Sequence, residues 1–161
     1  MVNKMSVEVG DKSLTFARVF QAPKELVFSA YTDADAIKQW FGPETYPVTF
    51  CEIDLRPGGQ WHYCMTGPNG EEAWGIATYT EIEPSTRLAY RDAFSDADRT
   101  VIPPEGNVTV TFEDREPGQT LLTAHTVYPS NDERDQVVAM GVEEGIGQSF
   151  ANLDRWLEAR R

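Results

Sequence analysis

The sequence has 161 residues, of which 40% are hydrophobic and 25% are charged. A chain of this length fits one domain, and such a domain buries about 68–70% of the surface that its unfolded chain exposes, so its core has room for a pocket. Asp and Glu total 26 against 14 Lys and Arg, which gives a formal net charge of -12. This field repels nucleic-acid phosphate and anionic lipid, and we expect neither a nucleic-acid nor a membrane role.

The N-terminal residues 1–12 contain no apolar segment typical of a signal peptide, and no apolar run is long enough to span a bilayer. We therefore expect a cytoplasmic protein.

Cys51 and Cys64 are too few for a disulfide framework and lack the Cys or His companions of a zinc site. One hairpin register described below would set them opposite each other, but a reducing compartment favours free thiols. We expect no metal and no cofactor.

The predicted elements begin with a strand over residues 13–20, where large apolar side chains alternate with smaller or polar ones. Residues 1–12 are expected to be a loosely ordered or edge segment. Pro23 suits the first turn of a short helix. Asp33 is a candidate N-cap for a second brief helix that runs through Gln39.

Six strand-like segments follow, at residues 48–55, 60–65, 73–82, 87–94, 108–113 and 120–128. Turn residues such as Pro57-Gly58-Gly59 and Gly67-Pro68-Asn69-Gly70 separate them. Consecutive short connections predict an antiparallel meander. The polar stretch at residues 95–106 is the one mid-chain loop long enough to act as a flap.

The last predicted element is a single long helix over residues 130–158. Ser130 and Glu133 form a capping-box pattern at its start, and apolar residues then recur at spacings of three or four. Such a helix would form one wall of the core. It contains three glycines, which cost about 1 kcal/mol each relative to Ala in an exposed helix, so either a close approach to the sheet or room for a ligand should compensate. These are Gly141, Gly145 and Gly147.

Specific motifs accompany this order of elements: Arg18-Val19-Phe20-Gln21-Ala22-Pro23, Val27-Phe28, Trp40-Phe41-Gly42-Pro43, Cys51-Glu52-Ile53-Asp54-Leu55-Arg56-Pro57-Gly58-Gly59, Glu81-Ile82 with Arg87-Leu88, and the helix segment 141–153. In these motifs the sequence resembles the START-like (SRPBCC) superfamily and, within it, homologues of the activator of heat-shock-protein-90 ATPase. The resemblance covers nearly the whole chain. It implies an α+β helix-grip (Bet v-like) fold in a single domain over residues 1–161. That fold has a curved antiparallel sheet of six to seven strands, two short helices and a long C-terminal helix.

The resemblance also implies a cavity between the sheet and the C-terminal helix. The members of the superfamily include ligand binders, cyclase-like enzymes, self-resistance proteins and chaperone activators, and a fold alone does not choose among these.

Our leading hypothesis is a protein that binds a small apolar or aromatic molecule. The alternatives are a chaperone-associated interaction protein and a cyclase- or hydrolase-like enzyme. The eukaryotic activators carry an additional N-terminal domain that this sequence lacks, which counts against chaperone stimulation. Monomer and homodimer both remain open.

Aromatic and sulfur-containing side chains could converge around such a cavity. An apolar body with a polar end suits an amphipathic organic ligand, although the same residues could simply fill the core. The candidate ligand-binding residues are Trp40, Trp61, Tyr63, Met65, Trp74, Tyr79, Tyr90, His125 and Phe150.

The hairpin over residues 48–65 can be drawn in two registers. If Pro57 and Gly58 form a two-residue turn, Asp54 faces Trp61, and Glu52 lies on the same side of the sheet. A bulge at the Gly58-Gly59 pair would instead shift the register. The choice decides which of Glu52, Ile53, Asp54 and Leu55 face the cavity.

Three side chains are candidates for acid–base chemistry. In the first register Glu52 and Asp54 would line the cavity, where burial raises the pKa of a carboxyl. Arg18 could neutralise one of them, and a structural ion pair is the preferred interpretation. His125 is a candidate base because imidazole titrates near neutrality. The sequence offers no Ser-His-Asp set, phosphate-binding glycine loop or metal-ligand cluster.

Overall fold

The computed structural model describes residues 4–160 of the chain. The eight strands that it describes are β1 (Ser6–Gly10), β2 (Ser13–Phe20), β3 (Val48–Ile53), β4 (Gln60–Thr66), β5 (Glu72–Glu83), β6 (Arg87–Ser95), β7 (Ile102–Asp114) and β8 (Thr120–Val127). The helices are α1 (Lys24–Thr32), α2 (Ala34–Trp40), α3 (Asn131–Ala139) and α4 (Val142–Glu158). All strands pair antiparallel in one sheet, in the order β1-β2-β8-β7-β6-β5-β4-β3.

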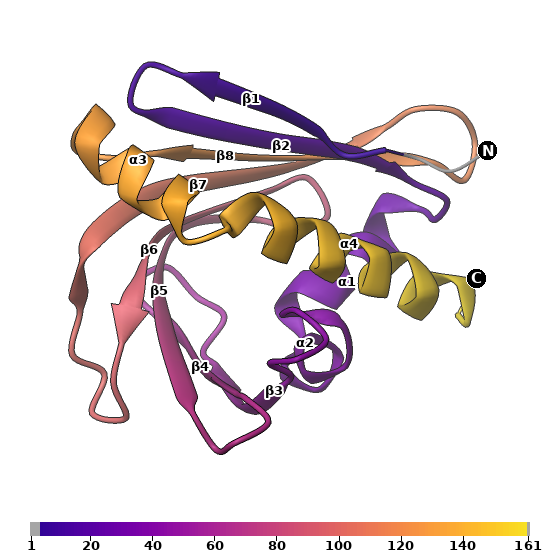
Figure 1. The fold of residues 1–161 in the computed structure, drawn as a ribbon. Coiled ribbons are helices and arrows are strands. Elements are labelled where there is room, and N and C mark those ends of the chain that lie inside the picture. The colour runs from indigo at the N-terminus through magenta and orange to yellow at the C-terminus, as the bar shows by residue number, and fades with distance from the viewer. Residues whose placement is uncertain (1–3, 161) are drawn as a thin grey trace.

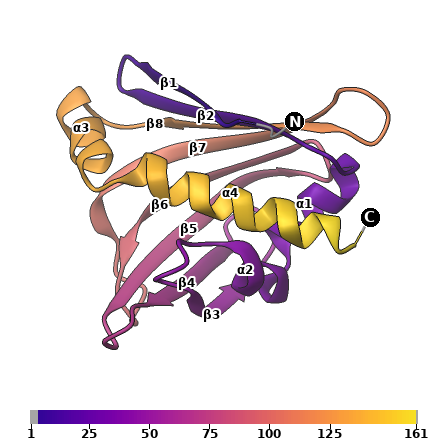
Figure 2. The same ribbon diagram turned by 45° about the vertical axis from the view of Figure 1, so that its right-hand side comes forward.

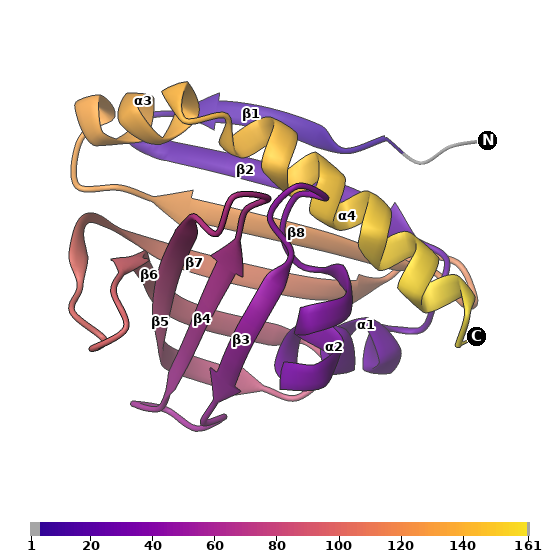
Figure 3. The same cartoon turned by 60° about the horizontal axis from the view of Figure 1, so that its bottom comes forward.

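The sheet curves around α4, which lies across its concave face (Figures 1 and 2). Helices α1 and α2 fill the space beside the second half of α4, between it and the sheet (Figure 3). This is the predicted α+β helix-grip fold. The sheet has one strand more than the six to seven expected, because Ser6–Gly10 pairs with β2 as an edge strand. Residues 1–3 of the predicted N-terminal segment lie outside the described residues.

The N-terminal half forms much as its pattern predicts. Alternate residues of β2, including Phe16 and Phe20, are buried. The side chain of Asp33 accepts a hydrogen bond from the backbone N–H of Asp35 at 3.1 Å, so Asp33 is the N-cap of α2, as predicted. Phe20 then packs edge-on against Phe150 of α4, with 5.5 Å between the ring centroids. These contacts anchor the helices to the concave face.

The stretch at residues 95–106, expected to be one long loop, is only partly a loop. Strand β7 begins at Ile102, and the remaining loop, residues 96–101, folds onto the convex face of the sheet. There the Asp96 carbonyl lies 2.9 Å from Nε2 of His62, and Arg99 pairs with Glu52 at 2.8 Å. The loop therefore covers the face opposite α4 and does not close over the interior.

The single C-terminal helix predicted over residues 130–158 is two helices. Ser130 caps α3 by accepting from the backbone N–H of Glu133 at 3.1 Å, as predicted. Gly141 then adopts a left-handed conformation with φ of 84°, which ends the α3 segment and redirects the chain into α4. No residue of α3 is buried. Only α4 grips the sheet.

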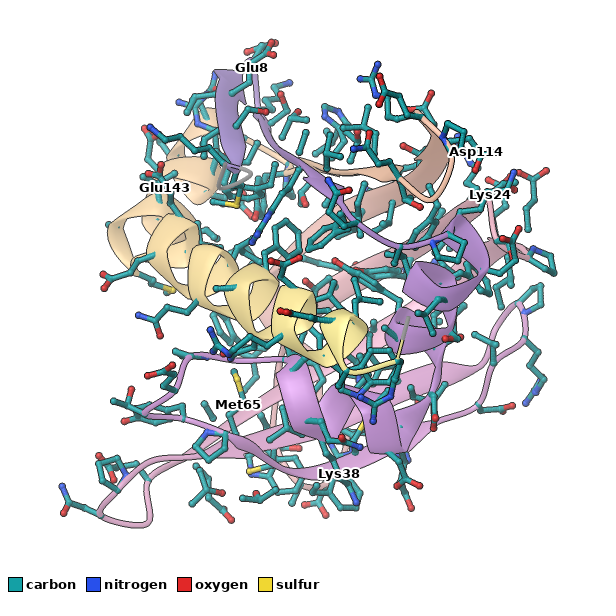
Figure 4. All side chains as sticks on the ribbon, turned by 90° about the vertical axis from the view of Figure 1, so that its right-hand side faces the viewer. Glu8, Lys24, Lys38, Met65, Asp114 and Glu143 are labelled. Atoms are coloured by element: carbon teal, nitrogen blue, oxygen red, sulfur yellow. The ribbon has the colours of Figure 1, made fainter. Side chains whose placement is uncertain are left out.

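Charged side chains lie mostly on the outer surface. Glu8 and Glu143 point away from the interior, and Lys24 of α1 lies beside Asp114 of β7 (Figure 4), with 3.2 Å between the charged atoms. Arg18, by contrast, is buried and forms an ion pair with Asp154 of α4 at 3.3 Å.

No helix within residues 4–160 is both long and apolar enough to cross a membrane.

Candidate ligand-binding cavity

An interior cavity lies between α4 and the concave face of the sheet. Its first chamber has a volume of about 220 Å³ and is lined by α4, the strands β4 and β6, and the segment after α2. A second chamber of about 90 Å³ lies against the aromatic core. The chambers share six wall residues: Phe41, Tyr63, Asp92, Tyr128, Val142 and Ile146. The two chambers are therefore adjacent and share part of their walls.

The Trp40-Phe41-Gly42-Pro43 motif forms the junction between α2 and the cavity. Gly42 has a φ of 93°, and a Cβ there would lie 2.9 Å from both the Met65 sulfur and the Tyr46 carbonyl oxygen, so only glycine fits. Its backbone N–H donates to the buried hydroxyl of Ser149 at 2.9 Å. This contact fastens the segment to α4 and directs Phe41 into the wall of both chambers.

The glycines inside α4 differ in what they face. Gly145 lines the first chamber, and a Cβ built on it has no atom within 4 Å. Gly147 does not line the cavity, and its Cβ would meet only Cε of Met5 at 3.8 Å. The expected close approach of α4 to the sheet is therefore absent at Gly145, where the helix leaves open space.

Asp92 is the one acidic residue in the described walls of the cavity, and it borders both chambers. Removal from water raises the pKa of its carboxyl from the ordinary value of 3.8 to about 7, although a hydrogen bond from the backbone of Ala93 opposes the shift. A break in the register between β6 and β7 lies beside it, where Asp92 pairs with Gly106. A Cβ on Gly106 would lie 2.7 Å from Cγ2 of Thr126, so this glycine lets the strands pack.

Three tyrosines surround this carboxyl. Burial, and then the negative charge of Asp92, raise the pKa of Tyr63 well above its ordinary value and that of Tyr128 to about 12. Burial likewise raises the pKa of Tyr90, with smaller contributions from Tyr31 and Asp92. All three phenols are therefore neutral near pH 7 and supply hydroxyls and ring faces, but no charge.

Five of the residues predicted to bind ligand line the cavity: Trp61, Tyr63, Met65, Tyr90 and Phe150. Met65 points toward the space beneath α4 (Figure 4). Tyr63 borders both chambers and packs against Phe41, with 5.3 Å between the ring centroids. The rings of Trp61 and Tyr63 lie 5.0 Å apart at a tilted angle, and both line the second chamber.

Two other predicted residues belong to the core and do not line either chamber. Trp40 is buried at the end of α2, and its indole N–H donates to the carbonyl of Ala30 at 2.9 Å. Tyr79 is also buried, and its ring meets Tyr90 edge-on at 6.1 Å. Trp40 and Tyr79 therefore fill the core, which was the alternative to ligand binding.

Trp74 and His125 lie on the convex face, so the prediction that they border the cavity is wrong. Successive residues of a strand point to opposite faces, and Gly75 and Tyr79 already occupy the concave side of β5. Trp74 stacks on His62 with 4.9 Å between ring centroids. His125 alternates with Ala124, which does line the second chamber, and its Nδ1 lies 2.7 Å from Oγ1 of Thr15.

The first register drawn for the hairpin is wrong, and the shifted alternative holds. Ile53 pairs with Trp61, and Cys51 pairs with Tyr63. The connection from β3 to β4 is a five-residue loop, closed by a hydrogen bond from the Asp54 N–H to the Gln60 carbonyl at 2.9 Å. Glu52 and Asp54 are consequently exposed on the outside of the molecule. The shift also places the two cysteines on opposite faces, and both are free.

The expected partner of Arg18 is also corrected. Glu52 pairs with Arg99, and Asp54 pairs with Arg56 at 2.8 Å, so neither carboxylate meets Arg18. Arg18 lies on the concave face, where Asp154 of α4 is its partner and its guanidinium lies 5.0 Å from the Phe20 ring centroid. A structural ion pair was the correct type of interaction, with a different acid.

The most distinctive wall residue, Asp92, was missing from the sequence-based candidates. A signal for it exists, because Asp92 has the same strand parity as the buried residues Leu88 and Tyr90. Polar residues at such positions are uncommon and are normally satisfied by a partner. Phe41 was missed because it lies just beyond the end of α2, where periodicity does not indicate a face. Tyr128 was missed although it shares the strand parity of Leu122 and Ala124.

A curved antiparallel sheet closed by a C-terminal helix over an interior cavity defines the helix-grip class of START-like proteins. The sequence profile of the Activator of Hsp90 ATPase homolog 1-like protein family matches residues 21–158, and the chain belongs to this family. The match covers every element described above except β1 and β2. A comparison with curated proteins finds no match.

Solved structures similar to this chain come from several bacteria. One is a crystal structure of a protein from Mycobacterium smegmatis, with 30% identity, a TM-score of 0.87 and coverage of 98% of each chain. A solution structure from Arthrobacter aurescens has 28% identity and a TM-score of 0.88 over 96% of this chain and 91% of that one. A third, from Staphylococcus epidermidis, has 28% identity and a TM-score of 0.84, covering 98% and 96%.

Proposed function

We propose that this protein binds a small, largely apolar organic molecule in the cavity between α4 and the concave face of the sheet. The observation that carries the proposal is Gly145. An interior helix glycine costs about 1 kcal/mol relative to Ala, yet an added Cβ here would meet nothing within 4 Å. Gly145 therefore lowers the stability of α4 and leaves space beside it unfilled. A bound molecule could occupy that space.

The walls and the volume indicate what could enter. Aromatic and aliphatic side chains such as Phe41, Tyr63 and Ile146 make up most of the lining. An apolar cavity of about 150 Å³ holds benzene, so a first chamber of about 220 Å³ admits one ring with a short substituent. Phe94, which is 43% exposed, also lines the chamber and extends its apolar surface toward solvent.

Thermal unfolding in the presence of a panel of small aromatic and cycloaliphatic compounds tests the proposal. A ligand at a hundredfold excess over its Kd adds about 2.7 kcal/mol, which in a protein of this size raises Tm by about 5–10 °C. Gly145→Leu should abolish the shift because its side chain enters the first chamber. Gly147→Leu is the matched control in the same helix and should keep it.

Two results would contradict the proposal. The first is a panel in which no compound moves Tm of the wild-type protein. The second is an equal ligand shift in the wild type and in Gly145→Leu, which would place binding elsewhere on the surface.

A second candidate function is contact with a heat-shock-protein-90-type ATPase. The family description and the net charge of -12 favour it, since an acidic surface can steer a basic partner. Adding this protein to a purified ATPase of that class should then change its turnover, and the change should weaken as salt is raised. Unchanged turnover at low salt would remove this candidate.

A further inference from the structure

Asp92 places an ionisable group without a counter-charge at the centre of the cavity. It borders both chambers, and no ion pair joins it to another side chain within residues 4–160. Its hydrogen-bond donor is the adjacent backbone of Ala93. Interior carboxylates are normally paired, because an isolated buried charge is costly. Because Asp92 lies in the cavity wall, a ligand in the cavity could supply the missing counter-charge.

The groups that face Asp92 are neutral. Tyr63 of β4, Tyr90 of β6 and Tyr128 after β8 carry raised pKa values and stay protonated near pH 7. Helix α4 contributes Val142, Gly145, Ile146, Ser149 and Phe150, and α3 contributes Val137. Among the described lining residues there is no Lys, Arg or His. The potential inside the cavity is therefore negative whenever Asp92 is ionised.

We propose, building on the ligand-binding function above, that the cavity selects small organic cations: molecules with an aromatic or cycloaliphatic body and a protonated amine that pairs with the Asp92 carboxylate. The charge-assisted hydrogen bond would satisfy the carboxylate. The rings of Phe41, Tyr63 and Tyr128 in the same wall offer faces to a cation.

The same arrangement disfavours anions. A ligand carboxylate or phosphate would meet a like charge at the half-buried Asp92 and no cationic side chain in the described lining. A neutral alcohol of the same shape could still enter, because the apolar walls and the tyrosine hydroxyls accept it. The inference therefore predicts an order of affinity: amine, then alcohol, then carboxylate.

Three probes with a common phenyl ring test this order: 2-phenylethylamine, 2-phenylethanol and phenylacetate. Isothermal titration calorimetry at pH 8 should show the amine binding at least tenfold more tightly than the alcohol, with phenylacetate weakest. Asp92→Asn keeps the shape of the side chain and should reduce the amine to the affinity of the alcohol. Asp98→Asn removes the same charge from an exposed loop position and should leave the tenfold preference intact.

A pH titration of the wild-type protein provides a readout that needs no variant. The amine stays protonated between pH 6 and 8, whereas Asp92, with a pKa of about 7, takes up a proton as the pH falls through that window. The preference for the amine over the alcohol should therefore decline from pH 8 to pH 6. The affinity of the alcohol should change little, because neither it nor the three tyrosines titrates there.

The outcomes separate the two proposals. If the alcohol and the amine bind equally at pH 8, or if Asp92→Asn keeps the preference for the amine, the cavity binds ligands but cation selection is refuted. Tightest binding by phenylacetate would also refute it. If none of the three probes, nor any compound of the broader panel, binds the wild-type protein, the ligand-binding function fails and the inference fails with it.

Discussion

Two aromatic clusters lie on opposite sides of the sheet at β4, in different surroundings. On the convex face, Phe50, His62 and Trp74 form an outer cluster in which each pair of rings lies within 5.6 Å. On the concave face, Phe41, Trp61 and Tyr63 lie within 5.3 Å of one another and border the cavity. A cluster of aromatic side chains therefore does not by itself indicate a cavity.

What differs is the element that covers each face. The loop at residues 96–101 lies directly on the outer cluster, and the carbonyl of Asp96 occupies the polar edge of His62 at 2.9 Å. Helix α4 instead spans the concave face and presents Gly145 to a chamber that Asp92 also lines, and Asp92 has no ion-pair partner within residues 4–160. A cavity is thus marked by small residues and unsatisfied polar groups in its cover and walls, more than by aromatic content.

Alanine substitution of one tryptophan on each face should show the largest effects. Trp61 is 3% exposed, so Trp61→Ala should lower the free energy of unfolding by about 3–5 kcal/mol. Trp74 is only partly buried, and Trp74→Ala should cost about 1–3 kcal/mol and leave ligand affinity unchanged. Urea unfolding and titration with the best-binding probe measure both. Equal costs, or a change in ligand affinity in Trp74→Ala alone, would contradict the contrast between the faces.

The pH dependence of stability should report Asp92. Its folded pKa of about 7 lies above the ordinary 3.8, so unfolding releases a proton between those values. Stability should therefore fall as pH rises from 4 to 7, by up to about 1.4 kcal/mol per pH unit, and then level off.

Asp92→Asn removes this titration. At pH 8 the variant should be more stable than the wild type by on the order of 2–4 kcal/mol, with the advantage shrinking toward pH 4. Unfolding in urea across this pH range, with Asp98→Asn as the control, gives the measurement. A variant that is less stable than the wild type at pH 8 would show that the carboxylate has a partner.

The two helix-associated glycines should respond in opposite directions to alanine. Gly145→Ala should stabilise the protein by about 1 kcal/mol, because the added Cβ meets nothing and the helix gains propensity. Gly141→Ala should destabilise it by about 1 kcal/mol, because the φ of 84° between α3 and α4 is strained for any residue with a Cβ. Thermal melts resolve a difference of this size. A destabilised Gly145→Ala would mean that α4 packs closely at this position.

The smallest effect is expected on the convex surface, at the ion pair between Arg99 and Glu52. Both side chains are substantially exposed, so Arg99→Ala should cost no more than about 1 kcal/mol. Because the loop that carries Arg99 lies opposite the cavity, ligand affinity should stay constant. A large loss of affinity would indicate that the two faces are coupled through the sheet.

The sequence determined the class of fold because its signals are local. Period-two and helical spacings, the Asp33 and Ser130 caps and the turn residues each describe a few consecutive residues, and the structure has nearly all of these elements. Helical periodicity did not reveal the break at Gly141, because a single left-handed residue leaves the spacing of apolar residues almost intact.

The candidate site was predicted only in part because its walls come from distant segments. Parity along β4 brought Trp61, Tyr63 and Met65 together correctly, since one strand sets their common face. The same rule, applied between strands, depends on loop length, and the five-residue loop at Leu55–Gly59 turned Glu52 and Asp54 outward.

By itself, then, the sequence determined the order of elements, the family and the aromatic character of the protein. Tertiary structure decided which aromatic residues face open space, and it placed Asp92 in a cavity wall where no described lining residue is a cation. The physical reason is that periodicity depends on residues that are close in the sequence. An empty volume or an unpaired charge depends instead on which distant residues the fold brings next to it. Only the crossing of α4 over the concave face brings Gly145 to the chamber that Asp92 also lines.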